Sequence, residues 1–289
     1  MPLRSPIYLD TETLLSHAEY NDIHMPHAAE IVETTRSKRS GGGKVGFSGI
    51  GAEGSIGNDV EVQSTYTLTP REKATVSRVI DDMVHQGIIT THPDDATAIS
   101  RDDLVEIEGT TRITSASLAG KAFYILRKMA GDAIVIDDNA VGVDQLLAIK
   151  DVELGASEVL DEFKSVYLHN ALLPVPILLQ VTGDRLPCKV YANLSPHYFV
   201  DDASKDRIEG ELRVLGTVSR IVDGGDDGYF SAEQWLLHDW EYMLRRFMML
   251  DIDKQVADLV ERIGLEQPLE DVHAYIKGPA IVVDVIALY

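Results

Sequence analysis

The chain is poor in cysteine and contains no long apolar run. Cys188 is the only cysteine among 289 residues, which excludes an intramolecular disulfide framework and a cysteine-rich zinc site. No stretch of 18 apolar residues occurs, so we expect no transmembrane helix. The first residues include Asp10 where a signal peptide needs its apolar stretch. Together these absences predict a cytoplasmic protein.

Positive charge is scarce as well. The chain has 26 lysines and arginines against 47 aspartates and glutamates, which gives a formal net charge of −21. Such a field repels nucleic acid and anionic membranes. We therefore expect no long nucleic acid as a partner, although one small nucleotide is permitted. The densest basic cluster is interpreted as a solvated linker or a local anion contact: Arg36, Lys38, Arg39 and Lys44.

Glycine, by contrast, is concentrated in one place, since residues 41–57 hold eight of the 22 glycines. A dinucleotide-binding turn has the spacing G-x-G-x-x-G and needs a helix directly after it. The spacing is present at Gly49, Gly51 and Gly54. Strand-like residues follow it instead of a helix, so no cofactor site is predicted. Lys44 does not belong to a phosphate-binding loop either, because Val45 stands where Ser or Thr is required.

The wider segment 34–64 has few large apolar side chains and many glycines and serines. It cannot bury enough surface to offset its ordering entropy unless something docks on it. We predict a flexible loop or a glycine-rich ribbon that orders on a protein partner or pairs with another copy of the chain. The interaction candidates within it are Lys44, Val45, Phe47, Ile50 and Ile56.

The patterns along the rest of the chain predict an α+β fold of mixed strands with several helices. A capping box at Thr69–Glu72 begins one helix, and Ser115 caps another. Runs rich in β-forming residues predict the strands. These runs are 103–113, 176–181, 189–194, 211–222 and 281–288.

Near the C-terminus we predict one long apolar helix, which starts at a second capping box on Ser231 and continues to about Ile263. Trp235 and Trp240 give this predicted helix large apolar side chains, so we expect it to form either the central core or an oligomer interface. The predicted organisation is an N-terminal strand and helix, the glycine-rich segment, a helix–strand subdomain and a C-terminal α+β subdomain. Their bounds are 1–33, 34–64, 65–150 and 151–289.

Candidate catalytic and metal-binding residues have simpler explanations. His24 and His27 lack a third ligand at matching spacing, and His238 lacks the second histidine of a zinc-protease helix. Cys188 has no neighbouring base. The acidic turn 223–228 lacks oxygen ligands at the spacing of a calcium loop. We predict no metal and no cofactor, and we favour a non-enzymatic protein.

Three segments together resemble a family of uncharacterised bacterial proteins known only as a domain of unknown function. They are PIYLDTETLLS at the N-terminus, DLVEIEGTTRI in the middle, and GPAIVVDVIALY at the end preceded by ELRVLGTVSRIV. The resemblance covers most of the chain in the same order. It implies a bacterial source and an α+β fold, and it suggests a role in stress or phage defence. It transfers no catalytic residue.

The sequence thus favours a binding or assembly protein that uses the glycine-rich segment for partner or self interaction. Two segments, VEIEGTTRI and LRVLGTVSRIV, resemble strands of small barrels that hold ligands or single-stranded nucleic acid. A small-ligand or nucleotide sensor is therefore the alternative. A hydrolase whose site is assembled from distant residues is a further alternative, because sequence spacing does not exclude one.

Overall fold

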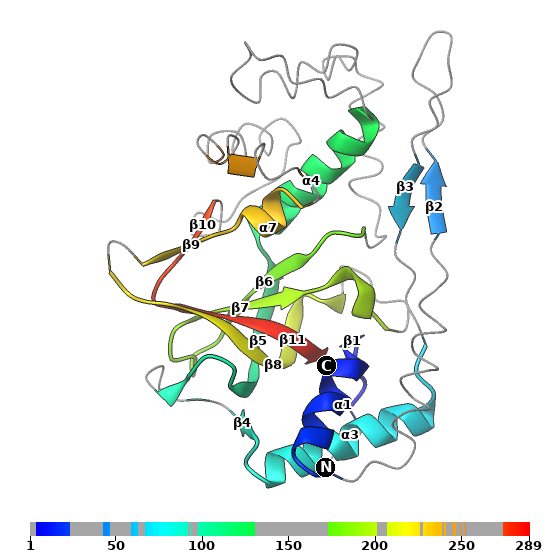
Figure 1. The fold of residues 1–289 in the computed structure, drawn as a ribbon, viewed down its shortest axis with the longest axis vertical. Helices are drawn as coiled ribbons and strands as arrows, with labels where there is room; N and C mark the ends of the chain where they lie inside the picture. The colour runs from blue at the N-terminus through cyan, green and yellow to red at the C-terminus, as the bar shows by residue number, and fades with distance from the viewer. Residues whose placement is uncertain are drawn as a thin grey trace.

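The computed structural model of the chain describes most of its regular elements (Figure 1). The residues that it describes are 4–23, 43–46, 59–62, 67–91, 93, 98–130, 173–200, 207–225, 228–238, 240, 245–246, 249, 252 and 274–289.

Five strands close into a barrel. In chain order they are β5 (Leu104–Ile113), β6 (Ile177–Thr182), β7 (Lys189–Leu194), β8 (Gly210–Val222) and β11 (Ala280–Leu288). β5 pairs with β6, β6 with β7, β7 with β11, β11 with β8, and β8 again with β5. All of these pairs are antiparallel except β7 with β11, which is parallel.

If the five barrel strands β5, β6, β7, β8 and β11 are counted 1 to 5 in chain order, their order around the barrel is 1-2-3-5-4-1. The third and fifth of them, β7 and β11, are parallel. This is the connectivity of the OB-fold, a five-stranded Greek-key barrel. The first strand, β5, closes the barrel by pairing with two strands. It pairs with β8 over residues 104–111 and with β6 over residues 110–113. The two segments that resemble barrel strands in sequence lie in β5 and β8, which are neighbours.

Alternation along each strand explains how this sequence fills the barrel. Successive side chains of a strand point to opposite faces, and one set of alternating apolar positions is buried inside. The inward set includes Val105, Ile107, Leu179, Val181, Val190, Ala192, Val214, Val218, Ile281 and Val283. Glycine is required where strands come closest, since a Cβ on Gly216 would lie 2.3 Å from the carbonyl oxygen of Asp284.

One part of the outer surface is covered by N-terminal elements, α1 (Thr11–Tyr20) and α3 (Pro70–His85). Asp10 caps α1 by accepting from the backbone N–H of Thr13, and Thr69 caps α3 in a full capping box with Glu72. The apolar faces of these helices pack on β8 and β11 in one buried cluster. Two short strands flank them, β1 (Tyr8–Leu9) beside β11 and β4 (Ile89–Thr91) beside β5.

Another part of the outer surface is covered by two insertions between barrel strands. One follows β5 and contains α4 (Ser115–Ala130), and the other follows β8 and contains β9 (Tyr229–Ser231), α7 (Glu233–Leu236) and β10 (Tyr275–Lys277). Figure 1 shows α4 and α7 side by side above the sheet. They pack so closely that a Cβ on Gly120 of α4 would lie 1.9 Å from the carbonyl oxygen of Trp235 in α7.

A separate two-stranded ribbon consists of β2 (Gly43–Gly46) and β3 (Asp59–Val62). The two strands are antiparallel, and the register pairs Lys44 with Glu61 and Val45 with Val60. The ribbon does not join the barrel sheet, and β3 lies beside α4. A 3-10 turn, η3 (Pro196–Tyr198), is also among the described elements.

The prediction of an α+β fold with one long apolar helix near the C-terminus is wrong. The core is mostly strands closed into a barrel, and closure depends on pairing between distant segments that local patterns do not report. Ser231 pairs in β9 with Tyr275 instead of starting a helix. The helix that follows, α7, ends after four residues, where Leu237 leaves helical geometry at φ −121° and ψ 41°. Within the described residues, no helix is both long enough and apolar enough to cross a bilayer.

Candidate functional site

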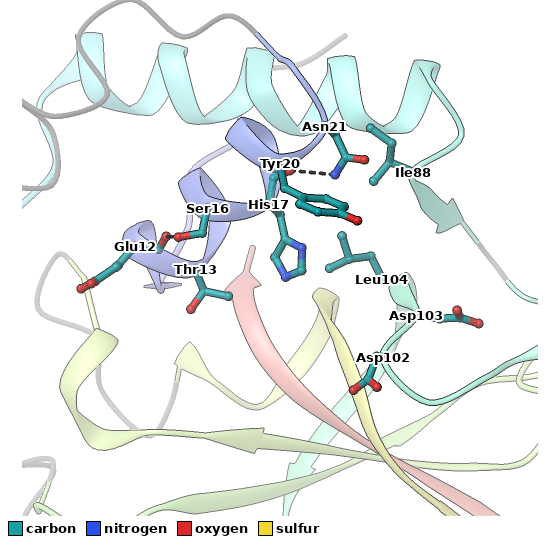
Figure 2. A pocket seen from close by; sticks show the side chains of 10 residues that line it. All are labelled: Glu12, Thr13, Ser16, His17, Tyr20, Asn21, Ile88, Asp102, Asp103 and Leu104. Atoms are coloured by element: carbon teal, nitrogen blue, oxygen red, sulfur yellow. Dashed lines mark hydrogen bonds between the residues drawn. The ribbon is translucent and has the colours of Figure 1, made fainter.

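An open groove lies between α1 and the start of β5, on the barrel side covered by the N-terminal elements (Figure 2). Its volume is about 560 Å³, within the usual range of ligand pockets. The lining residues come from three separate parts of the chain: Glu12, Thr13, Ser16, His17, Tyr20, Asn21, Ile88, Asp102, Asp103 and Leu104.

The α1 wall presents two rings to the groove. Figure 2 shows His17 and Tyr20 projecting from the helix toward Leu104, with Asp102 and Asp103 beyond it. Tyr20 is 87% exposed, one of the few large hydrophobic side chains left open to solvent among the described residues. A solvent-exposed aromatic ring beside a cavity provides a flat surface on which a ligand can stack.

The electrostatics of the groove favour a cation. Three carboxylates line it, those of Glu12, Asp102 and Asp103. Asp103 accepts from the backbone N–H of Ser100 at 2.7 Å. The carboxylate of Asp102 lies 3.8 Å from the guanidinium of Arg101, but both side chains are exposed, and exposed pairs of this kind contribute little.

His17 does not offset this negative charge near neutral pH. Partial burial of the ring lowers its pKa below the ordinary value of 6.5, because desolvation disfavours the charged imidazolium. The neutral ring can still donate or accept a hydrogen bond. The groove therefore combines negative charge, an exposed aromatic ring and one neutral imidazole.

The hydroxyl groups of the groove are held by α1 itself. Ser16 donates to the carbonyl oxygen of Glu12 at 2.9 Å, and Thr13 donates to Asp10 at 2.8 Å. A nucleophilic serine or threonine needs a base within hydrogen-bond reach, and these two hydroxyls point to helix-capping and backbone partners. The Ser16 hydroxyl is thus bonded to the α1 backbone, and the Thr13 hydroxyl to the capping carboxylate of Asp10.

The barrel offers a second surface, the outer face of β6, β7 and β11, but the chain itself occupies it. Leu178, Tyr191 and Val282 lie in one buried cluster with residues of α4 and α7. Trp235 of α7 is fully buried there, and its indole N–H donates to Asn193 Oδ1 at 2.9 Å. Asn193 Nδ2 in turn donates to Asp284 Oδ1 at 2.9 Å. The insertions therefore cover much of this face, while Asp284 stays exposed.

The residues singled out from sequence fall in different places. Lys44 and Val45 lie in β2 of the ribbon. Phe47, Ile50 and Ile56 lie outside the described residues, as do His24, His27 and the dinucleotide-like glycines. Trp235 and Trp240 are 0% and 7% exposed, in the cluster beneath α4. Their burial agrees with the core alternative, and an interface role for them stays a prediction.

Sequence reasoning missed the groove entirely. Its walls are separated by about 80 residues of chain, and each residue type in it is ordinary in its own segment. One signal was available, because Tyr20 is a large aromatic at the polar end of a short helix whose apolar positions lie elsewhere.

Comparison with known proteins gives one result. A family model described as "Domain of unknown function (DUF6414)" matches residues 3–289. This confirms the resemblance to a domain of unknown function that was inferred from the three sequence segments. Searches of curated proteins and of solved structures found no match to the chain.

Proposed function

The chain belongs to the DUF6414 family, and from that premise we propose that it is a non-enzymatic binding and assembly protein. It uses the glycine-rich segment, which includes strands β2 and β3, to contact a protein partner or a second copy of itself.

One observation carries this proposal, namely that the ribbon forms its own two-stranded sheet. Among the described strands, β2 pairs only with β3 and β3 only with β2. An isolated two-stranded hairpin is marginally stable in water, and its outer edges present unpaired N–H and C=O groups that accept another strand. Strand addition at an exposed edge is a common mode of protein recognition.

The barrel supports this assignment as a scaffold. Helices cover its outer surface on the side of α1 and α3 and on the side of α4 and α7. The face that barrels of this connectivity use for oligonucleotides packs here against α4 and α7 in one buried cluster. A net charge of −21 also opposes a long nucleic acid.

The test is removal of residues 41–57, which deletes β2 and the glycine run. We expect the shortened chain to keep the thermal unfolding midpoint of the full chain and to lose its self-association in sedimentation velocity. Tyr20→Ala, which alters an exposed ring elsewhere, is the matched control and leaves assembly intact. Self-association that persists after the deletion would refute assembly through this segment.

The groove beside α1 favours a second candidate, a small-ligand sensor. Its three carboxylates and the exposed Tyr20 ring select a cationic ligand, since a cation gains from nearby carboxylates and from the face of an aromatic ring. The same charges disfavour a nucleotide at this place, although a nucleotide sensor was one alternative from sequence.

Thermal shift separates these options, because a ligand that binds the folded state raises the unfolding midpoint. Arginine and spermidine should raise it, and AMP and ATP should not. Asp102→Asn should weaken the shift, whereas Asp184→Asn, in the exposed turn between β6 and β7, should preserve it. A shift that Asp102→Asn leaves unchanged would remove the groove from consideration.

We further propose a cytoplasmic location and a bacterial role in stress or phage defence. The location follows from the composition, and the role from the resemblance to an uncharacterised bacterial family. The genes neighbouring members of this family provide the check. Recurrent defence genes would support the role, and housekeeping neighbourhoods would oppose it.

A further inference from the structure

The two edges of the ribbon differ, and the difference selects how two copies can meet. β2 has the sequence Gly-Lys-Val-Gly and β3 has Asp-Val-Glu-Val. β2 therefore has one lysine and one valine between two glycines, whereas β3 has two carboxylate residues that alternate with two valines. The two edges also differ in surroundings, because β3 lies beside α4, and Figure 1 shows β2 on the side of the ribbon away from that helix.

Resting on the proposed self-assembly, we infer that two copies pair through β2 in an antiparallel, two-fold arrangement with Val45 opposite Val45 of the second copy. The result is a four-stranded sheet in the order β3-β2-β2-β3. In this register Lys44 lies opposite Gly46 of the second copy, so no like charges face each other.

Pairing through β3 is disfavoured by its charges. Every antiparallel register that pairs more than one residue within β3 and sets valine opposite valine also sets a carboxylate opposite a carboxylate, because Asp59 and Glu61 alternate with Val60 and Val62. Like charges directly opposite each other destabilise a strand pair. A register shifted by one residue would avoid this only by placing valine opposite carboxylate, which mixes the two faces of the sheet.

Head-to-tail pairing of β2 with β3 of the next copy is disfavoured by size. Such an arrangement repeats every two strands, about 10 Å per copy at the usual strand spacing. A domain of this kind is roughly 30 Å across, so successive barrels would overlap. A two-fold pair avoids this, because antiparallel β2 strands direct the two barrels to opposite ends of the shared sheet.

Cysteine cross-linking tests the arrangement in the full chain. The single native cysteine is first removed by Cys188→Ala, and Val45→Cys or Val60→Cys is then introduced. Opposed residues of antiparallel strands have Cα atoms about 4.5–5.5 Å apart, within the range that a disulfide bridges. The two Val60 positions would lie about 14 Å apart, three strand spacings, which a disulfide cannot span.

We expect oxidation to give a covalent dimer of Val45→Cys and none of Val60→Cys. A dimer of Val60→Cys, with or without one of Val45→Cys, would overturn the inference, as would linking only in a mixture of the two variants. If Val45→Cys does not fold, a mixture of Lys44→Cys and Gly46→Cys replaces it. These two should link to each other and not to themselves, and failure to do so would overturn the inference.

The cross-linking also separates this inference from the proposed function. Suppose that deletion of residues 41–57 abolishes self-association but Val45→Cys gives no cross-link. The proposal of assembly through this segment would then stand, and the β2–β2 register would be rejected. Absence of both the link and any effect of the deletion would reject both.

Discussion

Two sheet surfaces of the molecule differ in how they are covered. They are the outer face of the barrel beneath α4 and the edge of the β2–β3 ribbon. On the barrel, apolar side chains of β6, β7 and β11 are buried, and the indole N–H of Trp235 has a partner in Asn193. On the ribbon, no described strand pairs with the outer edge of β2. This difference supports the proposal that the barrel provides stability and the appended edge provides recognition.

The groove beside α1 lies between these extremes. It is part of the well-packed body, yet it leaves Tyr20 and the carboxylates of Glu12 and Asp102 exposed to solvent. The barrel therefore has one sealed side and one partly open side. We therefore expect changes on the sealed side to alter stability and spare assembly, and changes on the ribbon to do the reverse.

The largest effect is expected from Trp235→Ala on the sealed side. Removing a fully buried aromatic side chain should lower the free energy of unfolding by about 3–5 kcal/mol, measured by urea denaturation. Trp235→Phe keeps a ring but loses the donor to Asn193, and it should cost less. Loss of self-association by Trp235→Ala in a chain that keeps its stability would mean that this tryptophan serves an interface instead.

Gly120→Ala should have a smaller effect on the same side. The added methyl would approach the carbonyl oxygen of Trp235 to 1.9 Å, so α7 or α4 must shift. We expect a loss of about 1–3 kcal/mol from overpacking, despite the better helix propensity of alanine. The matched control is Gly183→Ala, whose methyl would come no closer than 3.6 Å to its nearest neighbour. Equal stability of the two variants would contradict the close packing of α4 on α7.

The smallest effect concerns His17 in the open groove. Its pKa is lowered in the folded state by desolvation, so the unfolded chain binds the proton first as pH falls. The stability that the neutral ring contributes is present above about pH 6.5 and is lost as the pH falls through the folded-state pKa. His17→Gln should reduce the pH dependence of the urea unfolding midpoint across this window. His85→Gln, on the exposed surface of α3, should not reduce it. If the urea midpoint depends on pH equally steeply in both variants, His17 is excluded as the cause.

Local patterns predicted many of the elements. Thr69, Pro70 and Glu72 specify the start of α3 through a capping box, which the structure contains. The apolar runs in β5, β8 and β11 were recognised as strands because their composition is a local property. These signals depend on neighbours in sequence, so they can be read without tertiary information.

Closure of the barrel could not be read in this way. The parallel contact between β7 and β11 joins residues 189–193 to 280–284, and nothing in either segment specifies the other. The predicted long helix failed for a related reason, since Ser231 and Gln234 have the spacing of a capping box but Ser231 is held in β9 by Tyr275. Tertiary pairing overrode a local helix signal. The groove was missed because its walls meet only after α1 packs on the barrel.

Native mass spectrometry of the untagged full chain tests the central claim most directly. Assembly through the β2 edge predicts a species at twice the chain mass of 31.8 kDa, which disappears when residues 41–57 are deleted. A single-chain mass at every concentration, or a dimer that survives the deletion, would contradict it.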